Sequence, residues 1–210
     1  MIKTVALNKG DEIPDFNHHD GLWVLGGPQQ VWQESNYPWL VDEKQAIREA
    51  INSGFPYFGL CLGHQLLADS LGGEVGIASS PEVGLLEVEL TEAGRNSPFF
   101  AGLDGPMCCI QGHAAEVKVA PSGFTVLARS DDCAIQAVSL GDSVLSMQFH
   151  AEFTLGMIDA CLELPEYKND FEAMLGSSGI SQFIQRCNES AAILENAARI
   201  LYTNWIQSIS

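Results

Sequence analysis

The segment Phe55–Gln65, which reads F-P-Y-F-G-L-C-L-G-H-Q, constrains the fold of this chain more than any other segment. An apolar run rises to Cys61, which has one glycine two residues before it and another two residues after it. A helical pattern of apolar residues begins directly afterwards. This order is typical of a nucleophile elbow, a sharp turn from a strand into a helix that exposes its central side chain.

The two glycines and the helix explain how such a turn works. A side chain at Gly59 or Gly63 would collide with neighbouring backbone or impose a disfavoured backbone conformation. The turn exposes the Cys61 sulfur near a helix N-terminus, where the dipole and the free N–H groups favour the thiolate over the thiol. Most single cysteines are packing residues, so a second element is required to mark Cys61 as a nucleophile.

That second element is the run Ser146–Glu152, S-M-Q-F-H-A-E, at the end of the apolar stretch Ser143–Phe149. A cysteine nucleophile needs an imidazole that takes its proton, and the imidazole needs a third group that holds its orientation. His150 and Glu152 are two residues apart just past a strand, so both side chains can project from the same sheet edge. We therefore predict a catalytic triad of Cys61, His150 and Glu152.

These motifs resemble those of class I (triad-type) glutamine amidotransferase domains. The resemblance runs from about Asp20 to Thr154, with Leu25–Pro28 similar to the glycines of the family's oxyanion strand. Three further segments resemble the stand-alone, GMP-synthase-like branch: Tyr37–Leu40, Glu82–Gly84 and Gln111–His113. The resemblance implies an α/β, flavodoxin-like fold, with an open, mostly parallel sheet flanked by helices and a small antiparallel β extension. A length of 210 residues suits one such domain, over residues 1–210.

The chain departs from the family pattern in three places. Ala151 stands where the family usually carries a proline, and the acidic residue that usually follows the second histidine is displaced to Glu116. The sequence begins at Ile2–Leu7, which resembles the family's second strand, so we expect this chain to lack the family's first βα unit. We expect the uncovered sheet edge to be closed by self-association into a homo-oligomer, by the C-terminal helix or by a partner protein, or else Ile2–Leu7 to form a bare edge strand.

The hydrophobic pattern predicts the remaining elements. A strand at Gly21–Leu25 and a helix around Asp42–Asn52 precede the elbow. Short strands follow, at Leu85–Leu90, Glu116–Val119, Phe124–Arg129, Ala134–Ser139 and Ser143–Phe149. An apolar stripe from Ile180 to Trp205 predicts C-terminal helices that cover one face of the sheet. Leu164–Gly179 is predicted as a loop or a short helix near the site.

Composition excludes several classes of partner. A net charge of −17 repels nucleic-acid phosphates and anionic lipid, so we expect neither nucleic acid nor a membrane as partner. No apolar run reaches the ~20 residues that span a bilayer, and the first residues lack a secretory signal, so we expect a cytoplasmic protein with reduced cysteines. The histidines and cysteines show no metal-ligand spacing, and no phosphate-binding glycine motif occurs, so neither a metal nor a cofactor is expected.

The resemblance implies a mechanism for the predicted triad. The Cys61 thiolate attacks the side-chain amide of glutamine, forms a γ-glutamyl thioester and releases ammonia. His150 acts as base and then as acid, and Glu152 orients the imidazole.

The resemblance also assigns residues around the triad. Backbone N–H groups of Gly27 and Leu62 form the oxyanion hole. Gln65 matches the position that holds the amino-acid part of glutamine. His113 lies in a segment that lines this pocket in relatives, and it is equally consistent with a structural loop histidine.

The fate of the ammonia is open, because nothing in the sequence resembles an ATP-using synthetase domain. The alternatives are a separate ammonia-accepting synthetase, a γ-glutamyl compound as substrate of a hydrolase or transferase, and a simple glutaminase. A non-catalytic partner or regulatory subunit that keeps the fold is the rival from a different class. The missing first βα unit favours that rival, whereas the complete Cys–His–Glu set disfavours it.

Overall fold

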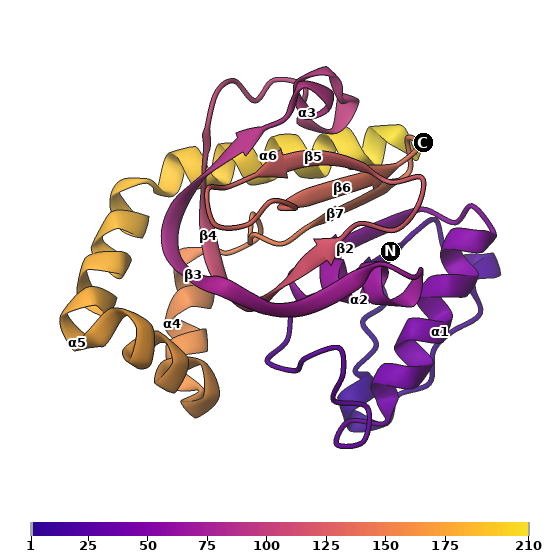
Figure 1. Ribbon diagram of the computed structural model, residues 1–210, viewed down its shortest axis with the longest axis horizontal. Helices are drawn as coiled ribbons and strands as arrows, with labels where there is room; N and C mark the ends of the chain where they lie inside the picture. Colours follow the sequence, from indigo (N-terminus) through magenta and orange to yellow (C-terminus); the bar gives the residue numbers. More distant parts are fainter. Residues whose placement is uncertain (1, 210) are drawn as a thin grey trace.

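The computed structural model describes residues 2–209, in which a curled sheet carries helices on both faces (Figure 1). The strands are β1 (Leu22–Val24), β2 (Tyr57–Leu60), β3 (Glu74–Leu90), β4 (Met107–Val119), β5 (Thr125–Arg129), β6 (Ala137–Leu140) and β7 (Val144–Met147). The helices are α1 (Trp39–Asn52), α2 (Leu62–Ser70), α3 (Glu92–Asn96), α4 (Leu155–Glu163), α5 (Pro165–Glu189) and α6 (Ala191–Ser208). Short 3-10 turns lie at Leu7–Lys9, Phe16–His18 and Pro98–Phe100.

The sheet combines a parallel part and an antiparallel part in the order β1-β2-β7-β6-β5-β3-β4. Strands β1, β2 and β7 are parallel neighbours, and every further pairing, from β7 through β6, β5 and β3 to β4, is antiparallel. The expected α/β fold with an antiparallel extension is confirmed. The extension is larger than the small one expected, because β3 and β4 form a long ribbon.

Neighbouring residues of β2 face opposite sides of the sheet, as the alternation of a strand requires. Tyr57 packs with Leu40 and Leu66 from α1 and α2, whereas Phe58 packs with Trp205 from α6. Figure 1 shows α1 and α2 together on one side and α6 across the other. The predicted apolar stripe of the C-terminal helices therefore covers a sheet face, as expected from the sequence.

The predicted strand at Ile2–Leu7 is wrong. Residues 2–6 have no regular structure, Ile2 is 90% exposed, and a 3-10 turn begins at Leu7. The backbone here forms local hydrogen bonds instead of pairing with a strand. The Ala6 amide donates to the Asp11 carboxylate, and the Asp11 amide donates to the Ala6 carbonyl. The sheet ends at β1 among the described residues.

The segment expected as a loop or a short helix, Leu164–Gly179, comprises the N-cap and more than the first half of α5. Leu164 is the N-cap of this helix, and Gly176 interrupts it with φ 68° and ψ 165°, so the helix is kinked there. Beyond the kink, Phe183 and Cys187 pack against Leu85 of β3. The second half of α5 thus covers the β3–β4 ribbon.

Candidate active site

Cys61 lies at the turn between β2 and α2 in a conformation that is rare for a residue with a side chain. Its φ is 51°, a positive value that no other described non-glycine residue has. The Cys61 amide donates to the Met147 carbonyl over 2.8 Å, and its carbonyl accepts from the Gln65 amide over 3.1 Å. These bonds tie the strained residue to β7 and to the first turn of α2, which is the geometry of the predicted elbow.

The two glycines that frame Cys61 are required by close backbone contacts. A Cβ atom at Gly63 would lie 2.2 Å from the Val24 carbonyl oxygen, and one at Gly59 would lie 3.0 Å from the Gly63 carbonyl group. Helix α2 therefore starts directly against β1, as the sequence predicted for this turn.

His150 and Glu152 follow β7 and reach the cysteine. The His150 amide donates to the Ile110 carbonyl of β4 over 2.8 Å, which fixes the backbone of this loop. Its Nδ1–H donates to Glu152 Oε1 over 2.6 Å, and the ring stacks on Phe153 with centroids 4.4 Å apart. Since Nδ1 is held by the carboxylate, Nε2 is the nitrogen available to the thiol.

The groups around His150 favour the protonated form of its imidazole. Burial by itself lowers the pKa of His150, which is 8% exposed. The charge and the hydrogen bond of Cys61, followed by those of Glu152, outweigh burial and raise the pKa of His150 to about 10. Cys61 and Glu152 together therefore stabilise the charged form of the imidazole.

The glycine loop after β1 lies against Cys61 and His150. A Cβ atom at Gly26 would lie 3.1 Å from His150 Cε1 and 3.4 Å from Cys61 Cβ. A Cβ atom at Gly27 would lie 3.2 Å from the Leu62 side chain. Gly27 and Leu62, the two positions predicted for the oxyanion hole, are therefore neighbours. Leu62 begins a helix whose first amides have no intrahelical acceptor.

A buried lysine anchors the segment that follows this loop. Lys44 of α1 donates to the Val31 carbonyl over 2.7 Å and pairs with Glu34 at 2.5 Å and Asp69 at 2.6 Å. Two carboxylates and a carbonyl offset the cost of burying the ammonium group. The contacts join the glycine loop to α1 and α2.

Gln65 and His113, the two predicted substrate contacts, meet at one backbone carbonyl. Gln65 Nε2 donates to the Ala115 carbonyl over 2.9 Å, and His113 Nδ1 lies 3.0 Å from the same oxygen. His113 Nε2 lies 3.1 Å from Glu82. Both ring nitrogens of His113 thus have protein partners, and its side chain is only 1% exposed. The structure places His113 behind Gln65, not beside the sulfur.

Sequence reasoning missed Gln148, which contacts the nucleophile. Its Nε2 lies 3.7 Å from Cys61 Sγ, and its Oε1 accepts from Gln65 Nε2 over 3.0 Å. The only signal in the sequence is the position of Gln148, two residues before His150 and directly after the apolar strand. Nothing local indicated that Gln148 meets the elbow.

The comparisons with known proteins agree with this geometry. Residues 2–162 match the family model described as glutamine amidotransferase class-I. The chain belongs to the class I glutamine amidotransferase family. This glutamine amidotransferase is 36% identical over 152 residues to a glutamine-hydrolyzing GMP synthase subunit of Sulfurisphaera tokodaii, and the match covers 72% of this chain and 77% of the relative. It is 33% identical over 153 residues to the corresponding GMP synthase subunit of Sulfolobus acidocaldarius, with the same two shares.

Solved structures of glutamine amidotransferases share the fold. The one from Thermotoga maritima matches with a TM-score of 0.84 at 23% identity, over 98% of this chain and 85% of that chain. The one from Methylobacillus flagellatus matches with a TM-score of 0.85 at 24% identity, over 97% and 83%. The resemblance inferred from the elbow and the H-x-E motif is therefore confirmed at the level of family and fold.

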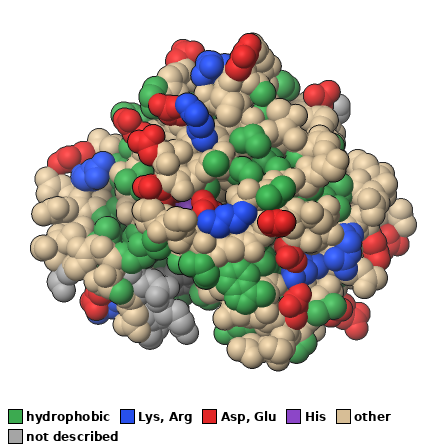
Figure 2. Space-filling model, viewed as in Figure 1, with side chains coloured by type: hydrophobic (Ala, Val, Ile, Leu, Met, Phe, Trp, Pro, Cys, Tyr) green, Lys and Arg blue, Asp and Glu red, His purple; other side chains and the backbone are tan. Residues whose placement is uncertain are grey.

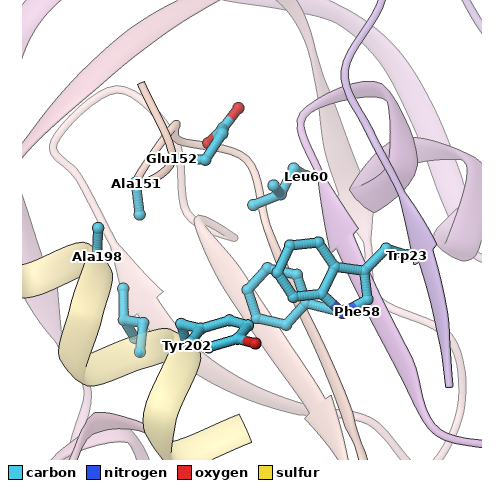
Figure 3. A pocket seen from close by; sticks show the side chains of 8 residues that line it. Trp23, Phe58, Leu60, Ala151, Glu152, Ala198 and Tyr202 are labelled. Atoms are coloured by element: carbon cyan, nitrogen blue, oxygen red, sulfur yellow. The ribbon is translucent and has the colours of Figure 1, made fainter. Parts of the chain in front are cut away.

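An apolar pocket of about 180 Å³ lies beside Glu152, between β1, β2 and α6 of this amidotransferase (Figure 3). Its walls include Trp23 and Tyr202, which are 39% and 47% exposed, together with Phe58 and Leu60. Figure 3 shows the rings of Trp23, Phe58 and Tyr202 gathered on one side of the pocket. This apolar surface therefore adjoins the loop that carries His150 and Glu152.

Figure 2 shows Asp and Glu side chains spread over the visible face, with several Lys and Arg side chains among them, and the net charge of the chain is −17. No helix among the described residues is long and apolar enough to cross a membrane. The described residues also contain no cluster of three His, Cys, Asp or Glu side chains arranged to hold a metal ion.

Proposed function

We propose that this glutamine amidotransferase hydrolyses the side-chain amide of glutamine through a γ-glutamyl thioester on Cys61. The observation that carries the proposal is the arrangement of His150. Its Nδ1 is bound to Glu152 over 2.6 Å, and its ring adjoins the sulfur of a cysteine held at φ 51° in the elbow. A buried imidazole that pairs with both a thiol and a carboxylate is the arrangement that nucleophilic cysteine catalysis requires.

The reaction follows from the roles of these groups. The Cys61 thiolate attacks the amide carbon, and the N–H groups of Gly27 and Leu62 bind the oxyanion that forms. The imidazolium of His150 gives its proton to the departing nitrogen, which leaves as ammonia. Neutral His150 then takes a proton from water, the hydroxide attacks the thioester carbon, and glutamate leaves as the C–S bond breaks.

Glutamine as substrate and a second protein as ammonia acceptor are supported by the relatives. The two archaeal proteins named above are described as glutamine-hydrolyzing, and each is named as one subunit of a GMP synthase. We infer that ammonia passes to a separate synthetase, and that Gln65 and the segment of His113 form the floor that receives the amino-acid part of glutamine.

The direct test incubates the purified chain with glutamine and measures ammonia and glutamate. We expect the two products in equal amounts from the wild type and none from Cys61→Ala, with both proteins equally folded by circular dichroism. A parallel arm uses a γ-glutamyl anilide, and faster turnover of the anilide than of glutamine would assign the chain to γ-glutamyl hydrolysis instead. Release of neither product, with or without the synthetase, would favour a non-catalytic role.

A further inference from the structure

A backbone carbonyl sets the orientation of the buried Gln148 carboxamide, to which it is linked by two successive hydrogen bonds. The Ala115 carbonyl oxygen can only accept, so the group of Gln65 that lies 2.9 Å from it is the NH₂ group. The same NH₂ group lies 3.0 Å from the Gln148 carboxamide, which must therefore present its oxygen to Gln65. The NH₂ group of Gln148 is then the one that faces Cys61 Sγ over 3.7 Å.

The hydrogen-bonded side chains of Gln65 and Gln148 are shielded from water. Gln148 is 0% exposed and Gln65 is 3% exposed. A carboxamide without protein partners at such a depth costs free energy, so the Gln65 contact and the sulfur contact are both stabilising. An N–H donor to sulfur gains strength when the sulfur is charged, because hydrogen bonds to ionised groups are stronger than neutral ones.

We propose that Gln148 donates a hydrogen bond to the Cys61 sulfur that favours the thiolate and stabilises this sulfur as it leaves the thioester. The second part rests on the proposed thioester mechanism. When water attacks the thioester carbon, its proton goes to His150 Nε2, and the C–S electron pair goes to Sγ as the bond breaks. His150 keeps the proton taken from water, and its imidazolium faces the departing thiolate. The N–H group of Gln148 is a second donor beside Sγ.

The variants separate this contact from the packing of the side chain. Gln148→Glu keeps the oxygen that accepts from Gln65. Only the NH₂ group that faces the sulfur is replaced, and the oxygen that takes its place repels a thiolate. Gln148→Met keeps the volume and removes both polar groups. Gln136→Met is the matched control, because Gln136 is a carboxamide that is also 0% exposed but bonds to Glu82 over 2.7 Å instead of to Cys61.

The experiment measures the rate at which iodoacetamide alkylates Cys61 between pH 5 and 10, with the labelled peptide identified by mass spectrometry. We expect Gln148→Met to shift the midpoint of the profile upward by about one pH unit, with about tenfold slower alkylation at pH 7. Gln148→Glu should shift it further in the same direction, and Gln136→Met should match the wild type. If Gln148→Met does not fold, Gln148→Glu decides alone. Profiles that coincide with the wild type, or an equal shift in Gln136→Met, would overturn the proposal.

A second readout tests the leaving-group role. Glutamine is added, the reaction is quenched in acid, and the fraction of γ-glutamyl enzyme is measured by intact mass. The Gln148 variants should accumulate more thioester than the wild type, and an unchanged fraction would refute the leaving-group role. The alkylation profile needs no glutamine, so a chain that fails to hydrolyse glutamine yet shows the shifted profiles would contradict the proposed function and keep the thiolate contact.

Discussion

Cys61 holds a backbone conformation that costs about 1–3 kcal/mol for a residue with a side chain. Two backbone hydrogen bonds, to Met147 and from Gln65, hold it there. The strained conformation places the Cys61 sulfur where His150, the N-terminus of α2 and the glycine loop converge. The strain is therefore consistent with a functional residue rather than with a packing cysteine.

The two partners of Cys61 should contribute unequally to the rate. His150→Gln removes the base, and we expect kcat to fall by about 10³-fold or more. Glu152→Gln leaves the imidazole in place and removes only its orienting charge, so we expect a loss roughly 10²-fold smaller. Steady-state kinetics of glutamine hydrolysis measures both variants. Equal losses, or a larger loss in Glu152→Gln, would contradict these roles.

His64, in contrast, is a structural histidine that links stability to pH. Burial lowers its pKa to about 3, and its ring nitrogens contact Ser146 over 2.8 Å and the Ile135 carbonyl over 3.3 Å. An unfolded histidine titrates near 6.5, so the unfolded chain binds more protons between pH 6.5 and 3. The stabilising contribution is complete above pH 6.5 and is lost as the pH falls through this window.

Urea unfolding at several pH values checks this prediction. We expect the wild type to lose stability below pH 6.5 by up to about 1.4 kcal/mol per pH unit more than His64→Gln. Ser146→Ala keeps the imidazole and should retain the steep dependence of the wild type. Parallel curves for the wild type and His64→Gln would show that His64 does not titrate on unfolding.

At the scale of elements, the β2–elbow–α2 unit is assembled by contacts that leave no room for a side chain. Gly63→Ala would place a Cβ atom 2.2 Å from the Val24 carbonyl oxygen, and backbone must move to relieve this overlap. We expect a loss of several kcal/mol in the free energy of unfolding, together with loss of activity. Gly156→Ala, at a helix position with no neighbour within 4 Å, is the control and should be neutral or stabilising by about 0.5–1 kcal/mol. A Gly63→Ala variant as stable as the wild type would refute the steric argument.

The parts of this fold that sequence predicted are those set by local rules. The glycine spacing around Cys61 dictates the elbow, and His150 and Glu152 follow directly after the predicted apolar strand, which places them at its end. The α1 and α6 stripes likewise follow from helical periodicity. Each of these features needs only neighbouring residues. The parallel pairing of β2 with β7 then brings Cys61 and the segment of His150 to the same end of the sheet.

The parts that sequence did not predict depend on distant partners. The predicted strand at Ile2–Leu7 has an apolar pattern but pairs with no strand among the described residues. The first half of β3 is alternating and half-polar, and it becomes a strand only because β4 pairs with it. The orientation of the Gln148 carboxamide depends on a hydrogen bond from Gln65, which is 83 positions earlier in the chain. Pairing and long-range polar contacts are decided by the tertiary fold.

At the scale of the molecule, β1 is the terminal strand of the sheet and pairs only with β2 among the described residues. Trp23 of this strand and the neighbouring Leu25 are 39% and 57% exposed. An unpaired strand edge beside exposed apolar side chains favours association. We expect a second copy of the chain to cover this edge. Sedimentation equilibrium should show a dimer at micromolar concentration that Trp23→Ser weakens, and a monomer at every concentration would contradict the expectation.

The central claim is that Cys61 is the nucleophile of a glutamine-hydrolysing site. The most direct measurement treats the folded chain with an electrophilic analogue of glutamine and maps the label by mass spectrometry. We predict that the label lies on Cys61, that excess glutamine protects it, and that His150→Gln slows it. Burial raises the pKa of the thiols at the other five cysteines, Cys108, Cys109, Cys133, Cys161 and Cys187, so these should react far more slowly. A label spread evenly over the six cysteines, or labelling of Cys61 that glutamine does not slow, would contradict the account.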